Sequence, residues 1–154
     1  LSLRWLLPFL DGLTLNVSAS YNDTYTTEDF QSASGQAVPS DSPWPLSPRW
    51  QTSSSLAYVL PLASWKAAVS LRHTYSSEAC NAIECQAMVF DYRTLDANLA
   101  LASLDLRWLP ELSLGVNNLT NERGISNISN NPTLGDSYSY IPPRMLTVRL
   151  SGSF

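Results

Sequence analysis

Apolar and polar residues alternate along most of this chain with a period of two. The clearest example is residues 13–22, where Leu13, Leu15, Val17, Ala19 and Tyr21 are separated by polar residues. Because successive side chains of a β-strand point to opposite faces, this alternation predicts a strand with one apolar and one polar face. The same pattern recurs at 1–5, 56–60, 65–72, 94–101, 111–117 and 146–151. The sequence therefore predicts seven strands and no helix.

The connections between these strands alternate between short and long. Short connections are predicted at 7–12, 61–64 and 102–107, and long polar ones at 26–48, 76–91 and 124–142. In an up-and-down antiparallel sheet, this order brings all the long loops to one end. Short turns at one end and long loops at the other are typical of outer-membrane β-barrels, whose long loops are extracellular.

The polar face of the strands distinguishes a membrane barrel from a water-soluble sandwich. Its residues are mainly Ser, Thr, Asn and Gly with few charges, and its charged members are Arg4, Lys66, Arg72, Asp96, Glu111 and Arg149. Small polar residues suit the lumen of a barrel whose apolar face contacts lipid. Backbone groups in lipid must all be paired, which requires a closed cylinder. We therefore expect an all-β fold: about seven antiparallel transmembrane strands, a fragment whose remaining strands lie upstream of Leu1.

Composition supports this interpretation and excludes other classes. Only 14% of the 154 residues are charged, whereas about a quarter is usual for a soluble domain. The 9 basic residues are outnumbered by 13 acidic ones, so a nucleic-acid partner is not expected. Aromatic residues gather mostly near strand ends, as in the interfacial girdles of barrels. They are Trp5, Tyr21, Tyr25, Trp50, Trp65, Tyr75, Tyr92, Trp108, Tyr138 and Tyr140.

Three stretches resemble one family, the TonB-dependent receptors of Gram-negative outer membranes. Leu112-Ser-Leu-Gly-Val-Asn-Asn-Leu-Thr-Asn-Glu-Arg123 resembles the family's penultimate strand, which runs into an Asn-Leu-(Phe or Thr)-(Asp or Asn) tetrad. The segment 143–154 resembles its last strand, opened by Pro-Arg and closed by a terminal Phe. The segment 45–62 resembles a strand that follows a long outer loop.

The resemblance implies that residues 1–154 are the C-terminal part of a 22-stranded barrel whose N-terminal plug domain is absent from this chain. It implies no cofactor and a location in the outer membrane of a Gram-negative bacterium. Its partners would be membrane lipid, the inner-membrane TonB complex acting through the plug, the barrel assembly machinery and a small nutrient ligand such as an iron chelate. The family pattern also implies that Val148, Leu150 and Phe154 form the signal read by the assembly machinery.

Ligand recognition in this family uses the outer loops, which makes Trp44, Asp136, Tyr138 and Tyr140 candidate binding residues. Tyr and Trp side chains can stack on a sugar or chelate while Asn and Asp form hydrogen bonds; the third long loop also carries Asn127, Asn130 and Asn131. Cys80 and Cys85 are the only cysteines, and a small disulfide loop in an oxidising compartment is favoured over two free thiols. With His73 the only histidine, a zinc site is not expected.

The sequence thus favours a transport receptor and no enzymatic activity, importing a ferric siderophore, cobalamin, haem or an oligosaccharide. A passive outer-membrane channel without a plug remains an alternative. A secreted β-sandwich for adhesion or carbohydrate binding is a second alternative, and an outer-membrane hydrolase is a third.

Overall fold

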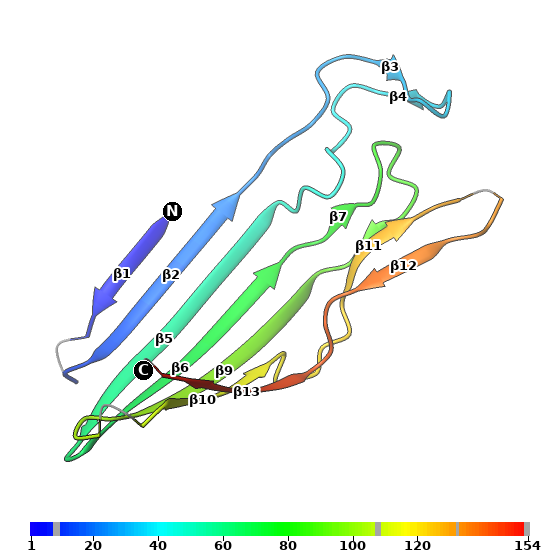
Figure 1. Cartoon of the computed structure of the whole chain (residues 1–154). Helices are drawn as coiled ribbons and strands as arrows, with labels where there is room; N and C mark the ends of the chain where they lie inside the picture. Colours follow the sequence, from blue (N-terminus) through cyan, green and yellow to red (C-terminus); the bar gives the residue numbers. More distant parts are fainter. Residues whose placement is uncertain (8–9, 107–108, 132, 153–154) are drawn as a thin grey trace.

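The main body of the protein is one antiparallel sheet of seven strands, in the order β1-β2-β5-β6-β9-β10-β13 (Figure 1). The computed structural model describes residues 1–7, 10–106, 109–131 and 133–152. The strands of this sheet are β1 (Ser2–Leu6), β2 (Leu13–Tyr21), β5 (Trp50–Leu62), β6 (Trp65–Ser76), β9 (Tyr92–Ser103), β10 (Glu111–Asn117) and β13 (Met145–Ser151). The prediction of seven up-and-down strands is confirmed. No helix long and apolar enough to cross a membrane occurs among the described residues.

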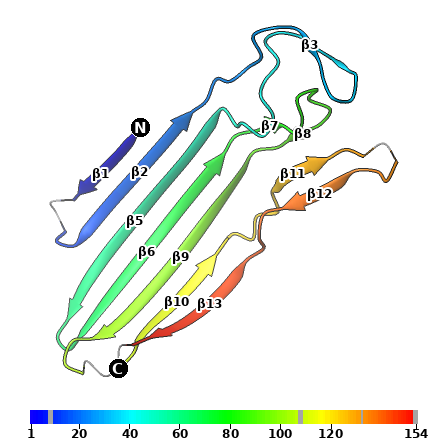
Figure 2. The ribbon, with the colours of Figure 1, turned by 45° about the horizontal axis from the view of Figure 1, so that its top comes forward.

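Each long loop contains a short hairpin that the sequence did not predict. These are β3 (Phe30–Gln31) with β4 (Ala37–Val38), β7 (Ala79–Cys80) with β8 (Met88–Val89), and β11 (Ile125–Ser129) with β12 (Ser137–Tyr140). Strands β3, β4, β7 and β8 have two residues each, too few for alternation to be recognised. In β11 the apolar residues are three positions apart, at Ile125 and Ile128, which hides the period of two. All three hairpins lie at one end of the sheet and the tight turns at the other, as Figure 2 shows. The predicted sorting of the loops is therefore present.

Strand β5 is much longer than the predicted segment 56–60. It begins at Trp50 and pairs with β6 from Gln51↔Ser76 to Leu62↔Trp65, so only Ala63 and Ser64 remain for the turn. The polar run of residues 51–55 hides the alternation in the first half of the strand. Pairing with β2 and β6 on both sides holds it in the sheet.

The apolar face of the sheet forms continuous rows across the strands. One row, given by the registers, is Leu13, Tyr58, Val69, Leu99, Leu114 and Val148. Large side chains on this face are exposed, including Leu71 at 41% and Leu146 at 80%. No second layer of described residues packs on it. A β-sandwich needs two packed sheets, so a single layer with an uncovered apolar face does not fit that alternative.

The opposite face is polar, as predicted. One row joins Ser2, Ser18, Ser53, Thr74 and Thr94, and the next joins Arg4, Asn16, Ser55, Arg72 and Asp96. Arg72 lies directly across from Asp96, yet among the described residues the ion pair within 4.0 Å is Arg49 with Asp23, outside the sheet. The Asp96 carboxylate instead accepts a hydrogen bond from the Asn118 backbone N–H at 2.8 Å.

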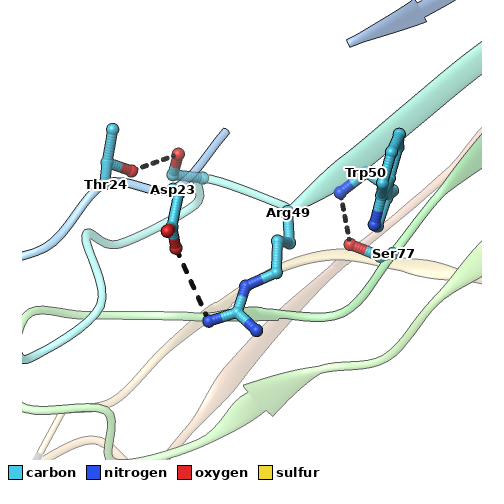
Figure 3. A network of polar contacts seen from close by, with 6 residues as sticks. Asp23, Thr24, Arg49, Trp50 and Ser77 are labelled. Carbon is cyan, nitrogen blue, oxygen red and sulfur yellow. Dashed lines mark hydrogen bonds and ion pairs between the residues drawn. The ribbon is translucent and has the colours of Figure 1, made fainter. Parts of the chain in front are cut away.

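Two aromatic rings mark the loop end of the apolar face. Tyr21 and Trp50 are cross-strand partners, with ring centroids 4.8 Å apart and planes tilted by 55°. Figure 3 shows the adjoining junction. The Arg49 guanidinium lies 3.7 Å from the Asp23 carboxylate, and the Trp50 backbone N–H donates to Ser77 Oγ at 3.0 Å. These contacts join the base of the first long loop to the end of β6.

Three other aromatic residues of the predicted girdles do not lie on the apolar face of the sheet. Tyr92 lies on the polar face, because it pairs with Ser76. Tyr138 and Tyr140 belong to the β12 hairpin beyond the sheet. Trp108 lies outside the described residues. Alternation placed aromatics near strand ends, but only the register assigns each to a face.

The Asn-Leu-Thr-Asn tetrad of residues 118–121 forms the junction between β10 and the last long loop. Asn118 is 4% exposed and has a φ of 50°, in the left-handed region that Asn tolerates better than most residues. Its Nδ2 donates to the carbonyls of Glu122 and Pro142, each at 2.9 Å, and its Oδ1 accepts from the Glu122 N–H. One buried side chain thus ties the turn to the chain that leads into β13.

Candidate functional site

The three long loops line an open cavity of about 660 Å³, which we call the outer cavity. Ser34 and Leu46 come from the first loop, Asn81, Ala82, Glu84 and Gln86 from the second, and residues 127–131 with Asp136 from the third. Segments that are far apart in the sequence therefore form one concave surface. Its size lies within the 300–1,000 Å³ range usual for small-molecule sites.

A disulfide closes the loop between β7 and β8. Cys80 and Cys85 are joined, with their Cα atoms 4.8 Å apart. Cys85 has a φ of 48°, and its N–H donates to the Ala82 carbonyl at 2.9 Å. Both sulfur atoms contact Met88 Sδ, at 3.8 and 3.6 Å. The covalent ring therefore presents Asn81, Ala82 and Glu84 from a compact turn.

Asn81 connects this ring to the third loop. The residue is 9% exposed, and its Nδ2 donates to the Ile128 carbonyl at 3.1 Å and to Asn130 Oδ1. Its Oδ1 accepts from the Ala87 N–H at 2.9 Å. A buried amide with all these groups paired is costly to disrupt, so Asn81 positions the β11 hairpin against the disulfide loop.

The first loop is joined to the same ring from the other side. The Leu46 N–H donates to the Cys80 carbonyl at 2.8 Å, and Ser34 Oγ donates to Glu84 Oε1 at 3.0 Å. The disulfide loop is thus the element that holds the outer loops together around the cavity.

The outer cavity carries negative charge from Glu84 and Asp136. Hydrogen bonds from Ser32, the Glu84 backbone N–H and Ser34 lower the pKa of the Glu84 carboxyl below its ordinary value of 4.5. Asp136 Oδ1 accepts a hydrogen bond from Asn130 Nδ2 at 2.8 Å. Both carboxylates are acceptors in a wall otherwise made largely of neutral amides and hydroxyls.

The outer cavity adjoins the loop end of the polar face of the sheet. Leu46 lines it and also lines a smaller hollow of about 100 Å³ with Gln51, Ser76 and Tyr92. These three residues are cross-strand partners on the polar face. In a barrel, the polar face surrounds the lumen, so the cavity would stand at the outer mouth of that lumen.

The four candidate binding residues are placed differently. Asp136 lines the outer cavity. Trp44, Tyr138 and Tyr140 are exposed at 55%, 49% and 61% and are not among its lining residues. The Trp44 backbone N–H donates to the Thr24 carbonyl at 3.0 Å. Tyr138 and Tyr140, in β12, are the cross-strand partners of Ile128 and Ile125 in β11. Their role in binding remains a prediction.

Sequence reasoning named Asn127, Asn130 and Asn131 but missed Ser34, Asn81, Glu84 and Gln86, all of which line the cavity. The closely spaced cysteines were a usable signal, because residues inside a disulfide ring are held rigidly. No cluster of three or more His, Cys, Asp or Glu suited to a metal ion occurs among the described residues.

The fold is similar to parts of two solved bacterial receptors. The ferric yersiniabactin uptake receptor FyuA of Yersinia pestis matches 94% of this chain with 21% of its own length, at a TM-score of 0.69 and 18% sequence identity. The siderophore receptor PiuA of Acinetobacter baumannii matches 90% of this chain with 19% of its own length, at a TM-score of 0.67 and 15% sequence identity. This chain therefore spans about a fifth of each receptor.

No family model and no curated protein sequence matches the chain. At these identities the structural likeness speaks for the fold. The resemblance to TonB-dependent receptors is confirmed at that level: the chain has the fold of a segment of the β-barrel of such a receptor.

Proposed function

We propose that this chain is the C-terminal portion of the barrel of a TonB-dependent receptor in the outer membrane of a Gram-negative bacterium. The complete protein would bind a scarce extracellular nutrient and import it with energy from the TonB complex through an upstream plug. The observation that carries this proposal is the single-layered sheet, apolar on one face and polar on the other, that superimposes on siderophore receptors at TM-scores of 0.69 and 0.67.

The outer cavity supports a binding role. A barrel strand has lipid on one side and the lumen on the other, so a soluble ligand can approach only from the loop end or the turn end. The loop end carries a cavity built from three loops that a disulfide and buried amides hold in place. We assign ligand capture to this end. Val148 and Leu150 lie on the apolar face of β13, and Phe154 lies outside the described residues; their role in barrel assembly stays a prediction.

Uptake in living cells tests the proposal. Deleting the gene should abolish growth on the transported nutrient when that nutrient is limiting, and deleting TonB should do the same with the receptor intact. A panel of ferric siderophores, cobalamin, haem and oligosaccharides would identify the nutrient. Receptor-dependent uptake that persists without TonB would instead indicate a passive channel.

A further inference from the structure

We propose that the outer cavity takes a hydrogen-bonding ligand without net negative charge, such as an uncharged ferric hydroxamate or a neutral saccharide. This inference rests on the proposed function and narrows its substrate class. Anionic ferric chelates, including catecholates and citrate complexes, are disfavoured at this site.

The chemistry of the cavity wall carries the first step. Its polar groups are the amides of five residues, the hydroxyls of Ser34 and Ser129, and the carboxylates of Glu84 and Asp136. The lining residues include no Lys, Arg or His. The amides of Asn81 and Asn130 are engaged with other protein groups, so a ligand would use those of Gln86, Asn127 and Asn131. Side-chain amides offer both donors and acceptors, which suits hydroxyl and amide groups of a ligand. Recognition of a carboxylate or catecholate would call for Arg or Lys.

The charge of the surrounding loops carries the second step. Residues 26–48, 76–91 and 124–142 contain no Lys, Arg or His at all. Their acidic residues are Glu28, Asp29, Asp41, Glu78, Glu84, Asp91 and Asp136. A cleft lined by charge of one sign concentrates ligands of the opposite sign and repels those of the same sign. An anionic chelate would meet this repulsion on approach as well as at the wall.

Among the described residues, no basic residue lines the cavity. Arg49, Arg93, Arg123 and Arg144 lie at the loop end just outside the three segments, and the seven acidic residues of the segments outnumber these four. Arg4 and Arg72 lie on the polar face and line a separate hollow with Asn16 and Ser55. Arg49, at the base of the first loop, lies 3.7 Å from Asp23. Arg4, Arg72 and Arg49 are not among the residues that line the outer cavity.

Binding to the complete receptor, purified in detergent micelles, tests the inference. The probes are an uncharged ferric trihydroxamate, a neutral linear oligosaccharide and an anionic ferric tricatecholate, measured by calorimetry at low and high salt. We expect one neutral probe to bind at least about tenfold more tightly than the tricatecholate, which corresponds to about 1.4 kcal/mol. The neutral probe that binds distinguishes a chelate from a saccharide. Failure of both neutral probes to bind, or a tricatecholate affinity equal to theirs, overturns the inference.

Replacing the cavity carboxylates by lysine tests whether the discrimination against the anionic chelate arises at the cavity. The double variant Glu84→Lys with Asp136→Lys should raise the affinity for the tricatecholate by about tenfold through added attraction. The matched control, Glu28→Lys with Glu78→Lys, makes the same change of charge outside the lining and should have a much smaller effect. Equal gains in both variants would contradict an effect at the cavity. Asn127→Ala should weaken binding of the neutral probe.

The two proposals fail in different ways. TonB-dependent growth on the anionic chelate through this receptor would uphold the proposed function and reject the substrate class. Tight binding of a neutral probe, with uptake that persists without TonB, would uphold the substrate class and reject the transport mechanism.

Discussion

Leu114 and Ser113 are neighbours on β10 whose side chains point to opposite faces of the sheet. Leu114 pairs with Leu99 and Val148 on the apolar face, whereas Ser113 Oγ donates to Asn98 Oδ1 at 3.0 Å on the polar face. We expect Leu114→Arg to cost about 2–4 kcal/mol in the complete barrel, because it places a charge in lipid. Ser113→Arg should be milder. Equilibrium unfolding in lipid vesicles measures both, and equal costs would contradict the two-faced sheet.

The contacts of Asn118 account for an Asn at the first position of the tetrad of residues 118–121. Its buried amide satisfies the carbonyls of Glu122 and Pro142. Asn118→Ala leaves these groups without their partner. It also places Ala, which tolerates the left-handed region less well than Asn, at a φ of 50°. We expect a loss of about 1–3 kcal/mol in the free energy of unfolding. Thr120→Ala, at an exposed position of the same turn, is the matched control and should change stability little.

At the scale of elements, we expect the disulfide loop to hold the outer cavity together and to have little influence on the sheet. Closing so short a loop constrains the unfolded chain by roughly 2 kcal/mol in the chain-entropy model, but Cys80 and Cys85 lie in the β7–β8 hairpin, outside the seven strands. The variant Cys80→Ser with Cys85→Ser should therefore raise amide hydrogen exchange in residues 77–90 and 125–131. Exchange in β5, β6 and β9 should stay unchanged, and faster exchange there would contradict this independence.

The contact between the first two loops should depend on pH. Hydrogen bonds from Ser32, the Glu84 backbone and Ser34 lower the pKa of the Glu84 carboxyl, so they favour the ionised form. Their contribution is complete above the ordinary pKa of 4.5 and is lost as the pH falls through the lower folded value. Spin labels at Ala33 and Ala82 should show a broader distance distribution in acid. Glu84→Gln cannot ionise and should remove the pH dependence; persistence of the dependence in that variant would assign it to another group.

At the scale of the whole molecule, the sheet is an open layer. Its edges are β1 and β13, and Leu3, Val148 and Leu150 are exposed at 58%, 68% and 67%. Unpaired edges beside exposed apolar rows are a strong drive to aggregation. We expect the isolated chain to aggregate in buffer without detergent, as measured by sedimentation. A soluble monomer that unfolds cooperatively would contradict the assignment of the apolar face to lipid.

The seven strands of the main sheet, their two faces and the sorting of the loops followed from the sequence by itself. Alternation such as that of Leu13 to Tyr21 is a local property, and the side-chain geometry of a strand converts it directly into two faces. The order of short and long connections then fixed an up-and-down sheet. Strand β5 was underestimated, because its first half carries polar residues on both faces and only pairing with its neighbours reveals it.

The site was decided by the tertiary structure. Ser34, Glu84 and Asp136 come from three separate loops and share a cavity only because Asn81 and the disulfide ring join those loops. Such contacts depend on the direction in which each loop leaves the sheet, which no local pattern encodes. The face occupied by Tyr92 and the separation of Trp44 from the cavity were likewise set by register and packing. The sequence determined the barrel-like sheet and its charge, and the folded loops determined which polar groups face a ligand.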